Sequence, residues 1–374
     1  MTLFPYTTLF RSKAYHLTPM LADYLALRQM YGAPAMHAGN TTYGVNSTAG
    51  GSLDAMARLG AGATFLIADH GGRDGVNVSA SAAAQRIDLG AGAISDVMEA
   101  KGNMQIAPDT VIEDATGGRG ADTITGNAAA NQLIGGAGAD RLYGRSGADA
   151  LNGGNGDDRL WGEDGNDQLA GGAGNDSLYG GAGNDRLSDA GGTNLLDGGG
   201  GSDGLVGGGG ADQLIGGLGS DTISGNAGND RLDGGEGGDR LFGQDGADRI
   251  LGGAGHDIII GGAGDDLMFG GTGNDDLAAQ GGRDQLDGGA GNDLLRGGAG
   301  RDSFIFTSGA DTIRNFDGTQ DVINLRGLAG LDSWADVQDR LSQAGHHVEF
   351  RLGAETLRIE WTKLADLGAE HFLW

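Results

Sequence analysis

Aspartates recur at every ninth residue across the middle of the chain. Stepping by nine from Asp122 to Asp311 gives 22 positions, of which 20 are Asp and the other two are Asn131 and Asn194. Glycines precede each of these positions and an apolar residue follows two places later, so that the unit reads G-G-x-G-x-D-x-U-x, with U apolar. The range 117–305 holds 21 such nonapeptides without an insertion. This regularity predicts one small site built many times over.

The residue types at fixed positions of the nonapeptide predict calcium sites. Glycines at positions 1, 2 and 4 allow positive φ angles and close approach of carbonyl oxygens. Asp at position 6 adds a carboxylate, and a shell of oxygens alone suits Ca²⁺ better than Zn²⁺ or Cu²⁺. The alternative is an Asp that only accepts turn hydrogen bonds, but Asn, Ser or Thr would serve equally there. The predicted carboxylate ligands are Asp122, Asp140, Asp149, Asp158, Asp167, Asp176, Asp185, Asp203, Asp212, Asp221, Asp230, Asp239, Asp248, Asp257, Asp266, Asp275, Asp284, Asp293 and Asp302, and the predicted carbonyl ligands are those of Gly135, Gly138, Gly153, Gly156, Gly171, Gly174, Gly216, Gly252, Gly261 and Gly288.

Charge and composition indicate the same class of partner. The chain of 374 residues has a net charge of −27, and 117–305 alone holds 30 acidic residues against 11 Arg and no Lys. This balance argues against nucleic acid and anionic membranes and favours cations. No apolar run reaches the roughly 18 residues of a membrane span, and the absence of Cys excludes disulfides and Cys-ligated zinc. We expect the cation-free chain to be largely disordered and to fold on binding metal.

Elements of an all-β fold follow from the same repeat. Positions 7–9 predict a strand of about three residues whose central apolar side chain points inward, and stacked copies would form a parallel ladder around a thin core. Tyr143, Trp161, Tyr179, Phe242 and Phe269 stand at position 9, where they could bind sugars or an apolar partner but more simply cover the edges. Outside the repeats, helices are predicted over 18–32 and 333–344, and strands over 304–306, 321–325, 348–352 and 356–360.

The nonapeptide resembles the RTX calcium-binding repeat. This resemblance implies a right-handed parallel β-roll with two nonapeptides per coil and Ca²⁺ shared by Asp residues 18 apart, such as Asp122 and Asp140. By this rule the repeats make about ten coils with a length of about 50 Å. The weakest sites should lie at Asn131 and Asn194, and the nonapeptides at 189–197 and 279–287 lack Gly at position 1.

The flanks resemble the C-terminal domain of serralysin-type zinc metallopeptidases. TPMLADYLALRQMYGA at 18–33 is similar to the helix after their Met-turn, and TTYGVNS, QRIDLGAGAISDV and TVIEDATGGRGADTI follow in that family's order. Asp69, Asp74 and Asn77 form a candidate early calcium site, or else a plain acidic loop. The sequence contains no H-E-x-x-H, so Zn²⁺ belongs only to a catalytic module that this chain lacks, and we expect no catalytic residue. The pair His346 and His347 is expected at the surface.

These resemblances divide the chain and suggest how it is exported. We expect a cloning or assembly scar at 1–12, a remnant of the peptidase helix at 13–40, a pre-roll region at 41–116, the roll at 117–314, and a cap with a type I secretion signal at 315–374. The ending LADLGAEHFLW resembles such a signal. The expected function is calcium binding in the C-terminal domain of a secreted, extracellular serralysin-like peptidase, read here as a truncated gene or fragment. The alternative is a non-enzymatic RTX exoprotein at a cell surface or in a matrix.

Overall fold

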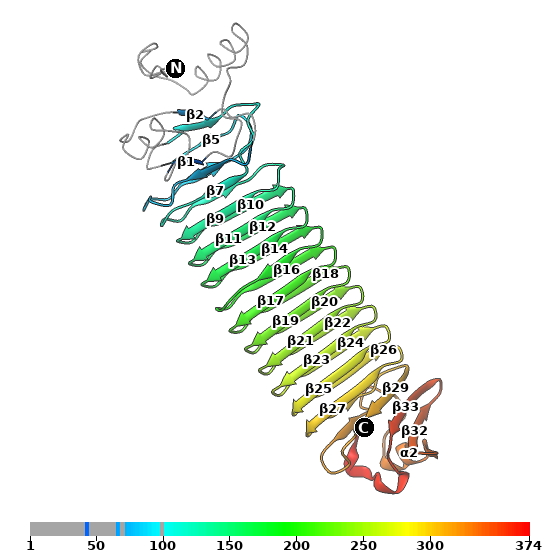
Figure 1. The fold of residues 1–374 in the computed structure, drawn as a ribbon. Helices are drawn as coiled ribbons and strands as arrows, with labels where there is room; N and C mark the ends of the chain where they lie inside the picture. The colour runs from blue at the N-terminus through cyan, green and yellow to red at the C-terminus, as the bar shows by residue number, and fades with distance from the viewer. Residues whose placement is uncertain (1–41, 45–64, 68–71, 98–100) are drawn as a thin grey trace, which may run out of the picture.

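The chain forms an elongated parallel β-solenoid (Figure 1). The computed structural model describes residues 42–44, 65–67, 72–97 and 101–374. Within them the fold is almost entirely β, as the repeat predicts. The expected helix over 18–32 and the two N-terminal segments at 1–12 and 13–40 lie outside the described residues.

Alternate nonapeptides contribute strands to two facing sheets. Each strand pairs in parallel with the strand 18 residues away, so that Leu142 lies beside Ile124 on one side and Leu160 on the other. The first sheet has 14 strands, and β8 to β28 of it come from the repeats. Its strands are, in order, β4 (Arg86–Asp88), β8 (Thr123–Thr125), β10 (Arg141–Ser146), β12 (Arg159–Asp164), β14 (Ser177–Ala182), β16 (Leu195–Gly200), β18 (Gln213–Leu218), β20 (Arg231–Glu236), β22 (Arg249–Ala254), β24 (Leu267–Thr272), β26 (Gln285–Ala290), β28 (Ser303–Ile305), β30 (Val322–Asn324) and β34 (Phe372–Leu373).

The second sheet holds 17 strands and continues past the repeats at both ends. Its last three strands form an antiparallel meander, and all the others are parallel. They are β1 (Thr42–Gly44), β3 (Gly75–Asn77), β7 (Asp114–Thr116), β9 (Gln132–Ala137), β11 (Ala150–Asn155), β13 (Gln168–Ala173), β15 (Arg186–Ser188), β17 (Gly204–Gly209), β19 (Thr222–Ala227), β21 (Arg240–Asp245), β23 (Ile258–Ala263), β25 (Asp276–Gly282), β27 (Leu294–Gly300), β29 (Ala310–Arg314), β33 (Glu355–Glu360), β32 (His347–Leu352) and β31 (Leu341–Ala344). A small third sheet joins β2 (Phe65–Ile67), β6 (Met104–Ile106) and β5 (Ile94–Ser95).

Most strands of the roll are twice as long as predicted. Strand β9 begins at Gln132, which is position 7 of one nonapeptide, and runs to Ala137, position 3 of the next. The residue at position 2 of the next nonapeptide therefore still pairs with the neighbouring coil, as Gly154 does with Gly136. The turn that bears the Asp is confined to about three residues.

The core is a double column of single apolar side chains. All 22 residues at position 8, from Ile124 to Ile313, are 0–2% exposed. Each is flanked in the strand by less buried residues at positions 7 and 9, as the alternation of a half-buried strand requires. The predicted thin, continuous core is confirmed, and it is lengthened at both ends by residues such as Ile87 and Ile323.

Glycine has two separate roles in the repeat. Gly136 and Gly138, at positions 2 and 4, have φ of 113° and 124°, as predicted. Position 2 also accepts larger residues, because Arg145 and Glu163 adopt φ of 78° and 73° there. The prediction was wrong for position 1, where glycine avoids a clash rather than supplying a positive φ. A methyl carbon on Gly144 would lie 2.5 Å from Oδ2 of Asp149.

The C-terminal region caps the last coil. Strand β34 pairs with β30 and ends the first sheet, while β33 pairs with β29 and extends the second. The predicted helix over 333–344 is too long: α2 spans only Trp334–Gln338, with Ser333 as its N-cap. Residues Leu341–Ala344 instead form β31, because they pair with β32 across the turn at Gly345. None of the helices in the described part of the chain has the length and apolar character needed to cross a membrane.

Candidate metal centres

The position-6 residues form two buried columns, one along each edge of the roll. Every one of them, including Asn131 and Asn194, is at most 4% exposed. Because consecutive coils are offset by 18 residues, Asp140 lies above Asp122 in one column and Asp167 above Asp149 in the other. The structure therefore brings together the residue pairs that the resemblance implied.

One oxygen of each carboxylate links neighbouring coils. The backbone N–H of Asp122 donates to Oδ1 of Asp140 at 2.7 Å, and the same bond recurs coil after coil. One column ends at Asp311, which accepts from Asp293, and the other at Asp321, which accepts from Asp302. These bonds satisfy turn amides that would otherwise be buried without a partner.

The other carboxylate oxygen, Oδ2, is buried and has no hydrogen-bond partner in 18 of the 19 predicted Asp ligands. Only Asp122, at the start of its column, differs, because its Oδ2 accepts from the Gly118 amide at 2.5 Å. A buried anionic oxygen without a partner costs several kcal/mol, on the order of a lost charged hydrogen bond or more. The repetition of this feature fits a cation that is part of the folded state.

Backbone carbonyls converge on the same points as the unpartnered oxygens. A methyl carbon on Gly198 would lie 2.5 Å from Oδ2 of Asp203 and 2.8 Å from the carbonyl oxygen of Gly216 in the next coil. Equivalent positions bring together Gly135, Gly153, Gly252, Gly261 and Gly288 with the Asp of the preceding coil. Carboxylate and carbonyl oxygens are the ligands that Ca²⁺ prefers.

Three of the other predicted carbonyls lie elsewhere in the turn. Those of Gly138, Gly156 and Gly174, at position 4, face the position-4 glycine of the following coil. Among the described residues, no three His, Asp or Glu side chains come close enough to hold a metal by themselves. Any ion in these turns must therefore take several ligands from the backbone.

The electrostatics of the columns oppose a fully charged, cation-free state. Burial raises the pKa of Asp158 and Asp266 to about 7, with further contributions from the Asp residues of adjacent coils. Burial and then the neighbouring Asp189 raise the pKa of Asp176 to about 7. At the C-terminal end, burial raises the pKa of Asp311 to about 8. Protons and cations therefore compete for these oxygens.

The candidate pre-roll site is only partly described. Asp69 lies outside the described residues. Asp74 is buried, and its backbone N–H donates to the Glu113 carboxylate at 2.8 Å. Asn77 accepts the Ser79 amide in a local turn. A calcium site at these residues stays a prediction.

A second ladder at position 5 was not predicted. The side-chain Oδ1 of Asn184 accepts the backbone N–H of Ser202 at 2.7 Å, and the backbone N–H of Asn184 donates to Oδ1 of Asn166. His256 and Asn274 take the same places further along. The recurring Asn and Asp at position 5, such as Asp157, Asn166 and Asn184, carry the sequence signal of this ladder.

The aromatic residues at position 9 divide between the two sheets. Tyr143, Trp161 and Tyr179 stack face to face, with centroids 4.6 and 5.6 Å apart. Phe242 lies on β21 of the other sheet, and Phe269 lies under Arg249. Because the three stacked rings cover one another's faces, the row supports the structural interpretation over sugar stacking.

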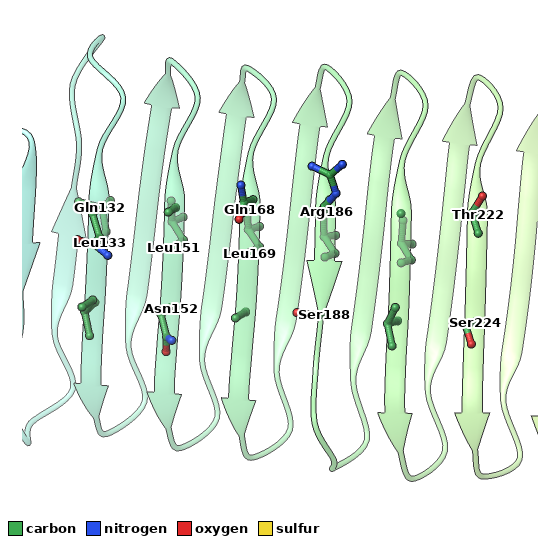
Figure 2. A pocket seen from close by; sticks show the side chains of 17 residues that line it. Gln132, Leu133, Leu151, Asn152, Gln168, Leu169, Arg186, Ser188, Thr222 and Ser224 are labelled. Carbon is green, nitrogen blue, oxygen red and sulfur yellow. The ribbon is translucent and has the colours of Figure 1, made fainter.

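A groove lies along β9 to β19, and Figure 2 shows the side chains that line it. Gln132, Gln168, Arg186 and Thr222 form one row of its lining, and Asn152, Ser188 and Ser224 form another. The lining contains no acid and no His. The groove therefore offers no general acid, base or metal ligand set. Elsewhere, His347 pairs with Glu349 and His346 stacks on Trp361, so this pair makes no joint site.

A two-sheet parallel solenoid with repeated buried acidic turns defines a class of repeat protein in which each coil contacts only its neighbours. The sequence profile described as Peptidase M10 serralysin C terminal matches residues 34–365. The chain belongs to this serralysin C-terminal family.

Individual relatives match a shorter segment. Serralysin A of Dickeya chrysanthemi is 42% identical over 111 residues, which is 29% of this chain and 24% of the relative. Metallopeptidase AprA of Pseudomonas marginalis is 38% identical over 113 residues, 30% of this chain and 24% of the relative. The matched segment thus spans about a quarter of the relatives' length. The extracellular lipase LipA of Serratia marcescens matches 72% of this chain and 44% of its own, at 15% identity and a TM-score of 0.26, which supports no conclusion.

Proposed function

We propose that this chain is a calcium-binding module in which each coil gains its stability from Ca²⁺ held between successive turns. The observation that carries the proposal is the pair of columns of buried, unpartnered Oδ2 atoms. Most of them lie beside a backbone carbonyl or a second carboxylate of the next coil, at a glycine without a side chain. Ca²⁺ would neutralise the charge of the columns, and by coordinating these oxygens it would give them the partner that no hydrogen-bond donor supplies.

Folding would then depend on the calcium concentration. Extracellular calcium modules bind with Kd of about 10⁻⁴ to 10⁻³ M, well above cytoplasmic levels. The chain would therefore stay largely unfolded before export and fold outside the cell. Its last strand, β34, is buried against β30 in the folded state, so a C-terminal secretion signal would be read before folding.

We place this module at the C-terminal end of a secreted serralysin-like metalloendopeptidase, exported by a type I system. The family match supports this context. No H-E-x-x-H is present in the sequence, so zinc catalysis would belong to another module, and this chain alone would be inactive. An array of 21 nonapeptides favours a second candidate, a non-enzymatic exoprotein of the same repeat class. The reading frame upstream, with or without a zinc motif, separates the two.

Far-UV circular dichroism of the full chain tests calcium-dependent folding. After chelation the spectrum should be that of a disordered chain, and millimolar Ca²⁺ should restore the β signal, whereas Mg²⁺ at the same ionic strength should not. An unchanged disordered spectrum, or a folded one that survives chelation, would contradict the proposal. Asp212→Ala should weaken one local site and leave distant coils folded, as expected for a solenoid with nearest-neighbour contacts.

A further inference from the structure

The nonapeptide 189–197 departs from the repeat at two positions at once. It has Asp189 at position 1, where all the others except 279–287 have glycine, and Asn194 at position 6, where all the others except 126–134 have Asp. Asp189 is 8% exposed, and its Oδ2 is buried with no hydrogen-bond partner. Its Oδ1 accepts the Gly191 amide at 3.0 Å. The preceding strand β15 ends early, at Ser188.

Asp189 faces the turn of the coil before it. A methyl carbon on Gly171 would clash with Oδ2 of Asp189 and with Oδ2 of Asp176, which is also buried and unpartnered. At the other position-1 glycines of the described roll, the nearest atoms include the side chain of only one residue. Two free carboxylate oxygens thus converge on one point here, where a regular coil has one.

The two departures therefore compensate each other. Asn194 keeps the coil-linking bond, since its Oδ1 accepts the Asp176 amide at 2.9 Å, but it adds no charge. The carboxylate missing from position 6 reappears at position 1 and serves the preceding turn instead. The turn 189–194 itself has the Asp189 side chain at position 1, where a regular turn has glycine, so it has no room for a cation of its own.

We propose that Asp176 and Asp189 together bind one divalent cation of the Ca²⁺ type in a two-carboxylate site unlike the regular sites of the roll. This inference rests on the proposed calcium-dependent function. Two buried carboxylates this close need either a shared proton or a counter-charge, and a divalent cation supplies the counter-charge where protons are scarce. Because affinity for Ca²⁺ rises with the number of charged ligands, this site should bind more tightly than its neighbours. The turn 171–176 then holds a strengthened site, and the turn 189–194, which contains Asn194, holds none.

Calcium titration of the full chain tests the site. Isothermal titration calorimetry and native mass spectrometry would give affinities and the number of bound ions for wild type and Asp189→Asn, and hydrogen exchange would locate the change. We expect Asp189→Asn to weaken one site by about tenfold or more, on the scale of one lost charged ligand, and to speed exchange at 171–176 only. Asp197→Asn removes the same charge at position 9 of the same nonapeptide and should leave the affinity of this site and the exchange at 171–176 unchanged.

The double variant Asp189→Gly/Asn194→Asp supplies a test that does not depend on a damaged turn. It restores the repeat pattern, so the turns 171–176 and 189–194 should both become regular sites, and the chain should bind one ion more than wild type. An unchanged ion count, or an Asp189→Asn titration identical to wild type, would overturn this inference alone. If wild type binds no Ca²⁺ at millimolar concentration, the proposed function fails with it.

Discussion

The backbone N–H of Asp140 donates to Oδ1 of Asp158 at 2.7 Å, while Oδ2 of the same Asp158 carboxylate is buried without a partner. One side chain thus links two coils and offers an oxygen to a cation. An amide can do only the first, as Asn194 does for Asp176. This division explains why Asp outnumbers Asn so strongly at position 6, and it joins the two interpretations of the repeat that the sequence had set against each other.

Stability should depend on pH with opposite signs in the two states of the roll. Folding raises the pKa of buried Asp residues such as Asp158 and Asp266 from 3.8 to about 7, so the folded cation-free roll binds more protons than the unfolded chain. Its stability is then greatest below about pH 4 and falls as the pH rises toward 7. With Ca²⁺ bound, protons compete for the same oxygens, and stability should fall as the pH drops below about 6.

In chelator, where the chain is disordered at neutral pH, the β signal in circular dichroism should rise as the pH falls toward 4, and in millimolar Ca²⁺ the urea midpoint should fall over the same pH range; together the two measurements give both slopes. Slopes of the same sign in the two buffers would contradict the prediction.

Gly198→Ala should destabilise the roll by about 1–3 kcal/mol, the range for an overpacked site. The added methyl would lie 2.5 Å from Oδ2 of Asp203 and 2.8 Å from the Gly216 carbonyl, so one of them must move. Gly204→Ala is the matched control, because its nearest atom would be 4.0 Å away and its φ is not positive. The urea midpoint in Ca²⁺ should fall for the first variant only. Equal midpoints would argue against the close packing of Gly198 on the carboxylate and the carbonyl.

Leu205→Ala should cost about 2–5 kcal/mol, because the side chain is 0% exposed and its loss leaves a cavity in a core one residue wide. Its neighbour Val206 is 40% exposed on the outer face. Val206→Ala should therefore change stability by no more than about 0.5 kcal/mol. Equal shifts of the two urea midpoints, measured in the same buffer, would contradict the assignment of Leu205 to the core and Val206 to the outer face.

Phe372→Ala should loosen the C-terminal cap. Phe372 is 2% exposed, lies against Trp334 with ring centroids 5.5 Å apart, and belongs to the strand that ends the first sheet. Its loss should cost about 3–5 kcal/mol in the cap and uncover the edge of β30, which favours association between copies. Trp361→Ala, at a side chain 78% exposed, serves as the control. Size-exclusion chromatography and hydrogen exchange at 322–324 would show the difference, and identical profiles would refute it.

Much of the architecture could be predicted because the repeat is unbroken. An apolar residue at every position 8 sufficed to predict the double column from Ile124 to Ile313. Strand length could not be read in the same way, because glycine has a low strand propensity and yet Gly136 pairs with the next coil. The cap was harder still, since Leu341–Ala344 is compatible with a helix until its pairing with β32 decides otherwise.

The site was predictable in kind but not in its exceptions. Asp at position 6 indicated calcium, whereas the role of position 1 required the clash at Gly144 to be seen in three dimensions. Asp189 looked like a simple loss of glycine. Its value lies in a contact with Asp176, 13 residues earlier in the chain but in the adjacent coil, and no pattern of nine contains that relationship.

Identical coils do not by themselves fix the register between turns of the roll, and the nonapeptide 189–197 helps to fix it. If one coil were skipped during winding, Leu would still meet Leu and Asp would still meet Asp, so most of the roll could not distinguish the slipped form from the native one. Asp189 occurs once in the roll and the stacked row from Tyr143 to Tyr179 is confined to three coils, so both have these neighbours in one alignment only. These side chains therefore favour the native register of the coils over a slipped one.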